Sequence, residues 1–375
     1  MKFLYYYSKL NIGGAEKSTV RLLNLLREKG HDITLLQRWS GGQLERELNP
    51  GVHILHLKVE HRTRSRAARL FFFALETLLS LFRRMRLGRT EYDICINGLF
   101  GYDPAILFRN IRAKQHYQML RNDVRETGDF GKTGKYMERY GSRFDAYIGV
   151  SKYTTESFRS VYPEFSGRAH TIYNVLPNIP DAFGDNPYRG YEDRLKIVSV
   201  CRLADRAKGL FRMAEVCAEL KRLYGNRFVW FIVGGGPDGE RLREKIRKLE
   251  LEDHMILCGT KPDPYPYYHD ADLVAVLSYY EGLCGVVNEA KLMRRPVIAT
   301  EFSGIHEQLT DGVNGKIVAN RADAILAAMR EFMEHPERLA AFRNNGLPEE
   351  LRDNDFKIRR FEELYLEIEK EKTHA

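Results

Sequence analysis

The chain has 375 residues, more than one ordinary hydrophobic core holds, so its length predicts two domains. Hydrophobic residues make up 43% and charged residues 29%, which is the balance of a globular chain and excludes a disordered one. A formal net charge of +8 predicts a surface that attracts an acidic partner, such as nucleic acid, an anionic lipid or a phosphorylated ligand. Five scattered cysteines without a Cys-x-x-Cys spacing favour a reducing compartment over a zinc site or a disulfide framework.

The N-terminus and the longest apolar stretch carry no signal for export or membrane spanning. The first residues lead within a dozen positions to Gly13-Gly14, without the cleavage site of a signal peptide. The stretch from Leu70 to Phe82 contains Glu76 and is shorter than the roughly 20 residues that span a bilayer. We therefore expect a cytoplasmic protein without a transmembrane helix.

Short β-rich runs alternate with helical patterns in the first half of the chain. A helix is expected over Glu16–Lys29, and strands are expected over Lys2–Tyr7, Asp32–Gln37, Tyr92–Asn97, Gln115–Leu120 and Ala146–Val150. This alternation predicts a parallel sheet with crossover helices, which we place in a domain over residues 1–178. The stretch that follows holds several prolines and glycines without apolar periodicity, which predicts a linker over residues 179–194.

The same alternation resumes after the linker. Helices are expected over Leu210–Tyr224 and Gly239–Leu249, and strands over Leu195–Val200, Phe228–Val233, Met255–Cys258, Leu273–Leu277 and Pro296–Ala299. The pattern predicts a second doubly wound domain over residues 195–350. Apolar residues at helical spacing within Phe356–Lys370 predict an amphipathic closing helix in the segment 351–375.

Ligands of doubly wound sheets bind beyond the carboxyl ends of the strands, so the loop after each strand is a candidate site. The loop after Leu195–Val200 carries Arg202, Arg206 and Lys208 at the start of a helix. Cations at a helix N-terminus suit a diphosphate, although solvated surface charge is an equally good interpretation of this loop alone.

The loop after Phe228–Val233 reads Gly234-Gly235-Gly236-Pro237-Asp238-Gly239, which matches the dinucleotide-binding fingerprint. NAD binding would also need an acidic residue about 20 positions further on. The sequence there is Cys258-Gly259-Thr260, so NAD is disfavoured. The alternative is a tight turn with Pro237 at the first helical position.

The loop after Leu273–Leu277 holds two carboxylates, Glu281 and Glu289, around a glycine-containing turn that leads into a helix. Carboxylates accept hydrogen bonds from sugar hydroxyls, so such a pair can hold a ribose and a second sugar ring. Alternatively, Glu289 is only an acidic residue early in its helix. Asp270 and Asp272 imitate a metal-binding Asp-x-Asp motif, but Asp272 directly precedes a strand and Asp270 ends a helix, so we assign no metal.

In this order, the pieces resemble the retaining GT-B glycosyltransferases of family 4, which include many cell-wall, capsule and lipopolysaccharide sugar transferases. The resemblance covers nearly the whole chain and rests on the segments Arg202 to Gly209, Gly234 to Gly239, Ala271-Asp272-Leu273, Ser278 to Ala290 and Pro296-Val297-Ile298. It implies two Rossmann-like domains that face a central cleft, with the acceptor on the N-terminal side and the donor in the C-terminal domain. It also implies that the C-terminal helix crosses back to the N-terminal domain.

The resemblance implies roles for particular residues. Arg202 and Lys208 would bind the donor diphosphate, Glu281 would contact the transferred sugar, and Glu289 would bind the nucleotide ribose. The whole implied donor set is Gly13, Gly14, Arg202, Arg206, Lys208, Gly234, Gly236, Gly259, Thr260, Glu281, Gly282, Leu283, Cys284, Gly285 and Glu289.

Three positions depart from the family pattern. The spacing from Arg202 to Lys208 is one residue longer than usual, so Arg206 could share the diphosphate role. Cys284 stands where Phe-Gly or Phe-Pro often completes the loop, and Arg294 replaces a common glycine before the Pro-Val-Ile strand.

Two motifs of the first half also resemble family features. Gly13-Gly14 is similar to the family's Gly-Gly loop beside the donor phosphates, although a lone Gly-Gly is otherwise only a turn. The family commonly has a histidine near the reacting centre where this chain has Arg121, with Asp123 nearby. The implied catalytic residues are therefore Glu281, Arg121 and Asp123. Ser151 is expected to cap a helix.

The segment from His61 to Arg89 surrounds an apolar, aromatic centre with arginines: Arg62, Arg64, Arg66, Arg69, Arg83, Arg84, Arg86 and Arg89. A basic helix of this kind can lie on an anionic membrane surface, and the acceptor would then be lipid-linked. The alternative is a crossover helix on the sheet, and we expect Leu75, Leu78 and Phe82 to pack in that way. Membrane contact by the arginines would make the protein peripheral on the inner face of the cell membrane.

Together these observations predict a glycosyltransferase that uses a nucleoside diphosphate sugar, with a UDP-sugar favoured, and a glycan or lipid-linked hydroxyl acceptor. Retention is implied, and neither a cofactor nor a metal is expected. The alternatives are a GT-B sugar phosphorylase, a nucleotide-sugar epimerase, and a non-catalytic binder of nucleotide sugar or nucleic acid. Nucleic acid is disfavoured because no platform of interleaved basic and aromatic residues is apparent.

Overall fold

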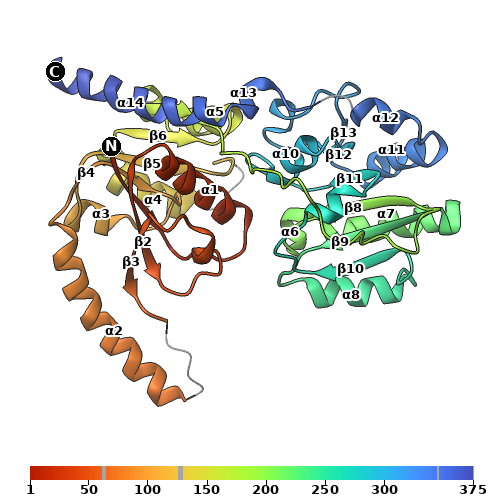
Figure 1. Ribbon diagram of the computed structural model, residues 1–375, viewed down its shortest axis with the longest axis horizontal. Coiled ribbons are helices and arrows are strands. Elements are labelled where there is room, and N and C mark those ends of the chain that lie inside the picture. Colours follow the sequence, from red (N-terminus) through yellow and green to blue (C-terminus); the bar gives the residue numbers. More distant parts are fainter. Residues whose placement is uncertain (61–64, 126–129, 344–345, 375) are drawn as a thin grey trace. The chain divides into compact units, whose positions relative to one another are not determined.

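Figure 1 shows the computed structural model of the chain, which describes residues 1–60, 65–125, 130–343 and 346–374. The chain forms two compact units. The N-terminal unit contains Met1–Val175 together with Asp353–Ala375, and the C-terminal unit contains Leu176–Arg352. Arg62 and Arg64 lie outside the described residues.

The N-terminal unit is built on a parallel sheet of seven strands in the order β3-β2-β1-β4-β5-β6-β7. The strands are β1 (Lys2–Tyr7), β2 (Asp32–Trp39), β3 (His53–Lys58), β4 (Glu91–Asn97), β5 (Arg112–Leu120), β6 (Ala146–Gly149) and β7 (Ala169–Thr171). Residues 3–7 are all buried, as expected for a parallel strand that is covered on both faces. The strand order reverses between β1 and β4, which makes the loops after these two strands the place where ligands of such sheets bind.

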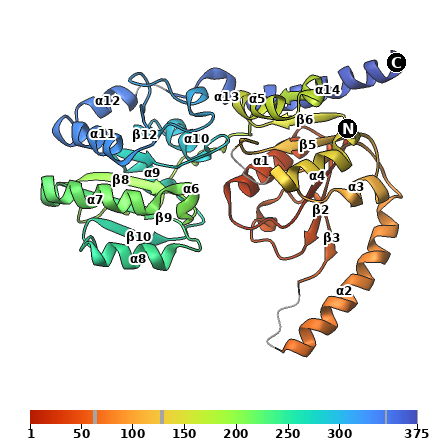
Figure 2. The ribbon, with the colours of Figure 1, turned by 180° about the vertical axis from the view of Figure 1, so that it is seen from behind.

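Helices cover both faces of this sheet, with α1 in front in Figure 1 and α4 in front in Figure 2. They are α1 (Gly14–Glu28), α2 (Arg66–Leu87), α3 (Ala105–Asn110), α4 (Phe130–Tyr140), α5 (Lys152–Val161) and α14 (Asn354–His374). Short 3-10 turns lie at Glu45–Glu47, Gly141–Arg143 and Pro163–Arg168. The Ser151 side chain accepts a hydrogen bond from the Thr154 N–H at the start of α5, so the predicted helix cap is confirmed.

The C-terminal helix α14 belongs to the N-terminal unit. It buries Ile358, Phe361, Leu364 and Ile368 along one side. The Gln115 amide of β5 donates hydrogen bonds to the Tyr365 carbonyl at 2.9 Å and to the Glu369 carboxylate at 2.7 Å. The apolar spacing noted in the sequence is therefore the face by which α14 packs.

The orientation expected for α2 is wrong. Leu78 and Phe82 are more than half exposed instead of packing on the sheet, and Leu75 is half-buried. The Glu76 carboxylate accepts a hydrogen bond of 2.9 Å from the Val59 N–H just after β3. This bond holds the polar side of α2 against the unit and turns the opposite side outward.

The C-terminal unit has a parallel sheet of six strands in the order β10-β9-β8-β11-β12-β13. The strands are β8 (Leu195–Val200), β9 (Phe228–Val233), β10 (Met255–Gly259), β11 (Leu273–Val276), β12 (Val297–Thr300) and β13 (Lys316–Val318). The prediction of two doubly wound parallel sheets is thus confirmed. Strands β3, β7 and β13 were not predicted.

The helices of this unit are α6 (Asp205–Lys208), α7 (Leu210–Tyr224), α8 (Gly239–Lys248), α9 (Tyr265–His269), α10 (Gly285–Leu292), α11 (Ala322–Glu334), α12 (Arg338–Arg343) and α13 (Glu349–Arg352), with 3-10 turns at Gly225–Arg227 and Ile305–Glu307. The helix α8 begins at Gly239 after Asp238, so Pro237 precedes the helix instead of opening it. Among the described residues, no helix combines the length and the apolarity that crossing a bilayer requires.

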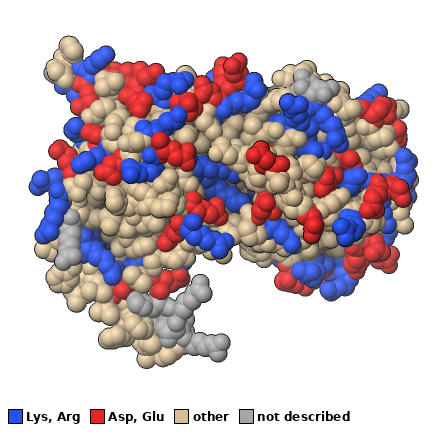
Figure 3. All heavy atoms as spheres, viewed as in Figure 1, with Lys and Arg blue, Asp and Glu red and all other residues tan. Residues whose placement is uncertain are grey.

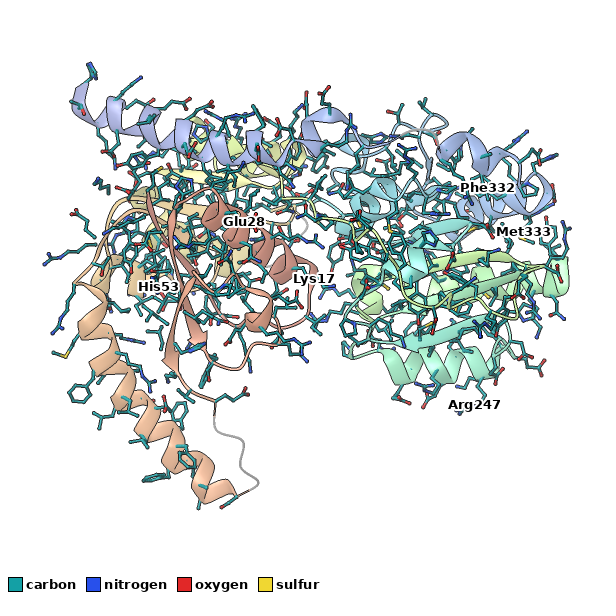
Figure 4. The ribbon with its side chains drawn as sticks, viewed as in Figure 1. Lys17, Glu28, His53, Arg247, Phe332 and Met333 are labelled. Carbon is teal, nitrogen blue, oxygen red and sulfur yellow. The ribbon has the colours of Figure 1, made fainter. Side chains whose placement is uncertain are left out.

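The core of the C-terminal unit lies on both faces of its sheet. Alternate residues of β9 divide between the faces: Trp230 packs with Phe332 and Met333 of α11, whereas Phe231 packs with Tyr188. Figure 4 labels Phe332 and Met333 at the end of α11. Tyr188 lies in the segment predicted as a linker, yet it is buried and donates a hydrogen bond of 2.8 Å to the Tyr267 carbonyl.

Candidate functional site

The loops after β8, β9 and β11 meet at the carboxyl edge of the C-terminal sheet. The Leu203 N–H donates to the Gly235 carbonyl at 2.9 Å, which joins the first two loops. The Tyr279 N–H donates to the Ala207 carbonyl at 2.8 Å, which joins the first loop to the third. Backbone hydrogen bonds therefore bring together three of the loops that the sequence singled out.

The glycine-rich turn fits this close packing of loops. Gly234 has a φ of +149°, and a Cβ atom there would collide with the Cys201 carbonyl oxygen. A Cβ atom on Gly236 would collide with the Leu203 carbonyl oxygen. Both glycines are thus required by the neighbouring loop after β8, which explains the fingerprint-like pattern without a dinucleotide. At the end of the next strand, β10, Gly259 has a φ of +69°, and the following residue, Thr260, is exposed.

Lys208 and Glu281 form an ion pair at the centre of these loops. The Lys208 ammonium donates to a Glu281 carboxylate oxygen, and the Ser278 hydroxyl donates to the same oxygen at 2.8 Å. Burial disfavours the charged form of Lys208, but the neighbouring groups, led by Glu281, together raise the pKa of Lys208 above its usual value. The cation predicted for the diphosphate and the carboxylate predicted for the sugar are therefore in direct contact.

Arg202 and Arg206 lie on the loop that carries Lys208, and their side chains are exposed. Neither guanidinium makes a hydrogen bond or an ion pair with another described residue. The nearby Asp205 carboxylate is engaged elsewhere, because it accepts from the Phe211 N–H at 2.8 Å in the first turn of α7. The loop thus offers two cations that can bind an anion without first breaking an ion pair.

Glu289 lies within α10 and is only 8% exposed. Its carboxylate accepts a hydrogen bond of 3.1 Å from the hydroxyl of Tyr268 on α9. Burial, together with this carboxylate, raises the pKa of Tyr268 well above its usual value, so the hydroxyl keeps its proton and donates. The Glu289 carboxylate is therefore buried and oriented by a tyrosine hydroxyl, which a purely dipolar role at a helix start does not require.

Two residues that the sequence analysis missed brace the loop that carries Glu281. The Arg212 guanidinium donates to the Leu277 carbonyl at 2.7 Å and lies over the Tyr279 ring at 4.2 Å. Arg212 also donates to the Asn320 side chain at 2.6 Å, and the Asn320 amide donates to the Tyr279 carbonyl at 3.0 Å. The signal that could have revealed Arg212 is a cation on the apolar side of the helix Leu210–Tyr224.

A third brace, Gln308, holds the start of α10. Its side-chain oxygen accepts from the Cys284 N–H at 3.0 Å, and its amide donates to the Cys284 carbonyl at 2.8 Å and to the Asn288 side chain at 2.5 Å. Gln308 is fully buried, and Leu283 and Cys284 are also buried. The turn from Gly282 to Gly285 is therefore fixed by one amide side chain.

The two glycines of the N-terminal unit lie at the start of α1. Gly13 is the N-cap of that helix, and Gly14 is its first residue. The Glu16 carboxylate lies so close to Gly13 that a Cβ atom there would collide with it. An acidic side chain thus stands at the helix N-terminus where the family resemblance implies contact with phosphate.

Arg121 is tied to the point where the strand order of the N-terminal sheet reverses. It donates to the Tyr5 hydroxyl at 2.7 Å, to the Thr19 hydroxyl at 2.9 Å and to the Gly98 carbonyl at 3.1 Å. These bonds use Nε and Nη2, and within the described part of the chain Nη1 makes none. Arg121 therefore has a fixed position and keeps N–H groups that a ligand could use.

Asp123 is buried and has different partners from Arg121. Its carboxylate accepts from the Ser157 hydroxyl and, at 2.9 Å, from the Arg125 N–H. These bonds hold the loop after β5 against α5.

Asp272 joins the starts of two strands. Its carboxylate accepts from the Lys196 N–H at 2.9 Å and pairs with the Lys196 ammonium at 3.0 Å. Over the described ranges, no three His, Cys, Asp or Glu side chains are grouped so that they could hold a metal ion.

Comparisons with known proteins match both halves of the chain. The model of the family "Glycosyltransferase Family 4" matches residues 12–176, and the model of "Glycosyl transferases group 1" matches residues 185–347. The two matches together span most of both units.

Named relatives agree with these matches. The chain is 29% identical over 224 residues to the GDP-mannose-dependent alpha-(1-6)-phosphatidylinositol monomannoside mannosyltransferase of Mycolicibacterium smegmatis. The matched region covers 55% of this chain and 57% of that protein. The chain thus spans little more than half of this relative. It is 22% identical, over the whole length of both proteins, to a Campylobacter jejuni alpha-1,4-N-acetyl-D-galactosaminyltransferase that is named for a diNAcBac-PP-undecaprenol-linked disaccharide.

A solved structure shares the fold. The Anabaena protein HepE, in complex with UDP and glucose, superposes with a TM-score of 0.74 at 17% identity, covering 97% of this chain and 98% of that one. These family matches and this fold show that the chain belongs to the group 1, or family 4, glycosyltransferases with a GT-B fold of two Rossmann-like units.

Proposed function

We propose that this chain transfers a glycosyl group from a nucleoside diphosphate sugar, with a UDP-sugar favoured, to a hydroxyl acceptor with retention of anomeric configuration. The observation that carries the proposal is the contact of Lys208, Glu281 and Ser278, on a loop that also carries Arg202 and Arg206, two exposed cations without an ion pair among the described residues. Cations of this kind stabilise the negative charge that develops on a departing diphosphate.

The carboxylates supply complementary contacts in this proposal. Glu281 is held by Lys208 and Ser278, so one carboxylate oxygen is already engaged and the group is oriented to accept from a hydroxyl of the transferred sugar. Glu289, held by Tyr268, accepts from the ribose hydroxyls of the nucleotide. Diphosphate binding between the cations competes with Glu281 for Lys208, which couples donor binding to the position of that carboxylate.

The names of relatives support the choice of substrates. The Mycolicibacterium relative is named for GDP-mannose and a phosphatidylinositol acceptor, and the Campylobacter relative for an undecaprenol-linked acceptor. The Anabaena structure contains UDP. Two of these descriptions name a nucleoside diphosphate and two name a lipid-linked acceptor, and we propose both for this chain. We also propose that the cations replace a metal ion at the diphosphate.

The first test is ligand-induced stabilisation, because a ligand that binds only the folded chain raises its melting temperature. UDP-, GDP-, ADP- and dTDP-sugars are compared on the wild type and on Glu289→Ala. The matched control is Glu215→Ala, which removes an exposed carboxylate that pairs with Lys245 on the same unit. We expect one nucleotide class to stabilise the wild type and the control, and to stabilise Glu289→Ala less.

Turnover is then followed with the donor that binds. Release of nucleoside diphosphate in the presence of EDTA, and unchanged by added Mg²⁺, is the expected result for a metal-independent transferase. The anomeric configuration of the product, read by NMR, tests retention. The proposal fails if millimolar nucleotide sugars of all four classes leave the melting temperature unchanged.

A further inference from the structure

The helix α2 turns a polar side toward its own unit and an apolar side outward, which is the reverse of an ordinary crossover helix. Its described buried residues are Glu76, Ser80 and Leu87, so two of the three are polar and only Leu87, at the end of the helix, joins the hydrophobic core. Glu76 accepts from the Val59 N–H at 2.9 Å and from the Arg83 guanidinium at 2.7 Å, and Arg83 also donates to the Leu57 carbonyl at 3.0 Å. The side of α2 that touches the rest of the N-terminal unit is therefore held largely by polar contacts.

The outward side of α2 is apolar. Seven large apolar side chains are between 51% and 76% exposed: Leu70, Phe71, Phe73, Leu78, Leu81, Phe82 and Met85. Phe71, Leu78, Phe82 and Met85 follow one another at intervals of seven, four and three residues, which places them on one side of a helix. Only two other large apolar side chains of the described chain, Val313 and Leu366, are more than half exposed.

The ribbon shows how this side comes to be free. In Figure 1, α2 passes beside β3 and extends away from the sheet of its unit, and Figure 2 shows the same from behind. Contiguous apolar surface of this kind marks an interaction site in a folded protein, since single exposed apolar residues are normal but a continuous row is not.

The charge of this segment indicates which kind of partner binds the apolar side of α2. The sequence from Arg62 to Arg89 holds eight arginines and one acidic residue, Glu76, and that acid faces inward. Lys58 adds a cation beside the helix, with its ammonium 4.8 Å from the centre of the Phe73 ring. Figure 3 shows lysine and arginine atoms next to the uncharged surface of α2.

A second copy of the chain does not fit this surface. In a two-fold dimer the same segment meets its own copy, and a segment with eight arginines and one acidic residue repels itself. An anionic bilayer satisfies both features, because its acyl region accepts the apolar row and its headgroups attract the cations.

We propose that α2 is a membrane-docking helix, which lies in the interface of an anionic bilayer with its Phe71, Leu78, Phe82 and Met85 side toward the acyl chains. The biological purpose of this docking rests on the proposed function, since a transferase on the membrane surface would encounter a lipid-linked acceptor that diffuses in the same bilayer. The binding itself depends only on the surface of α2.

The experiment measures partition of the full chain onto vesicles by flotation. Vesicles of phosphatidylcholine are compared with vesicles that also contain phosphatidylglycerol. We expect binding to the anionic vesicles and roughly ten-fold weaker binding to the neutral ones, with the difference reduced by salt. The triple variant Phe71→Ser/Leu78→Ser/Phe82→Ser should bind the anionic vesicles roughly ten-fold or more weakly.

The matched control is Val313→Ser/Leu366→Ser, which removes equally exposed apolar side chains elsewhere and should bind as the wild type does. Arg89→Glu, at an exposed residue just after α2, is a second variant that should weaken binding to anionic vesicles only. Circular dichroism confirms that each variant is folded.

Three outcomes overturn the inference: no binding of the wild type to anionic vesicles, equal binding by the triple variant, or a concentration-dependent dimer that the triple variant abolishes. Donor-induced thermal stabilisation is measured on the same samples. Its absence would refute the proposed function, whereas the vesicle result would stand or fall independently.

Discussion

Gln308 offers a sharp test of how the candidate donor loop is supported. The change Gln308→Leu keeps the size of the side chain and removes three hydrogen bonds, two to the backbone of Cys284 and one to Asn288. All these groups lie at the start of α10, next to the turn that carries Glu281. No water can replace the lost partner easily, because Gln308 and Cys284 are both buried.

The magnitude follows from the groups that are left unpaired. The Cys284 carbonyl keeps its bond from the Asn288 N–H at 3.3 Å, so the groups left without a partner are the Cys284 N–H and the Asn288 side-chain oxygen. A buried polar group without a partner costs about 1–3 kcal/mol, so these two together give roughly 2–6 kcal/mol. For a unit of this size that loss lowers the melting temperature by roughly 5–15 °C. The loosened turn should also raise the KM for the donor by about ten-fold, since binding must then order it.

The assay combines thermal unfolding with donor kinetics on Gln308→Leu and on a matched control, Gln115→Leu. Gln115 is equally buried and also makes three hydrogen bonds, to Tyr117, Tyr365 and Glu369, but it lies in the N-terminal unit. We expect both variants to lose stability and only Gln308→Leu to lose donor affinity. A donor KM that rises equally in both variants, or in neither, would refute the reasoning.

Three further predictions concern single side chains of the C-terminal unit. Lys208→Met removes the half-buried cation that pairs with Glu281 and should lower kcat/KM by about 10²–10³-fold. A steady-state assay that finds less than ten-fold loss would exclude its proposed role. Arg294→Gly should raise the melting temperature by about 2–4 °C in a thermal scan, because Arg294 has a φ of +54° that costs a non-glycine residue about 1 kcal/mol; an unchanged or lower value would contradict this. Burial lowers the pKa of Lys291 in the folded chain to about 8, whereas the usual value for the unfolded chain is 10.5. Between these two pH values the unfolded chain binds more protons. The destabilisation that comes from burying the charged amine is therefore complete below pH 8 and decreases as the pH rises towards 10.5. In denaturant unfolding at pH 8–10, the free energy of unfolding should therefore rise less steeply with pH in Lys291→Met than in the wild type, by up to about 1.4 kcal/mol per pH unit. Equal slopes for the two proteins would rule the effect out.

The strands that the sequence predicted are those with continuous apolar runs. Residues 228–233 are buried on both faces, so every position is apolar and the run is unmistakable. β3 escaped prediction because the run His53–Lys58 has only three apolar residues, which neither alternate with polar ones nor form a continuous run, and three of its positions are half-buried. β7 and β13 have three residues each, too few for any pattern.

The orientation of α2 shows what the spacing of apolar residues cannot predict. The spacing of its apolar residues reveals that the helix has two sides, but not which side faces the protein. That choice depends on the bond from the Val59 N–H to Glu76, a contact across 17 residues that no local pattern encodes. Sequence reasoning assumed that the apolar side is buried, and Leu78 and Phe82 show the opposite.

Some residues of the candidate site could be predicted from the sequence, and others could not. Arg202, Lys208 and Glu281 could be named from the sequence because they follow strands, and the ends of parallel strands share one edge of a sheet. Gln308 and Asn320 could not, since their partners Cys284 and Tyr279 lie 24 and 41 residues away and are reached only through the fold. The departure at Arg294 was visible in the sequence, but its left-handed backbone was not.

The helix α14 gives the chain an unusual tolerance to cleavage. Residues 176–352 leave the N-terminal unit, and α14 returns to it, so that unit is made of two separate pieces of chain. Lys29 pairs with Asp355 at 2.8 Å and Lys372 with Asp145 at 2.9 Å, in addition to the apolar face of the helix. A protease cut near residue 180 would therefore produce two fragments that each contain part of one hydrophobic core. Such fragments are complementary halves, and separately expressed they should assemble into one particle through α14.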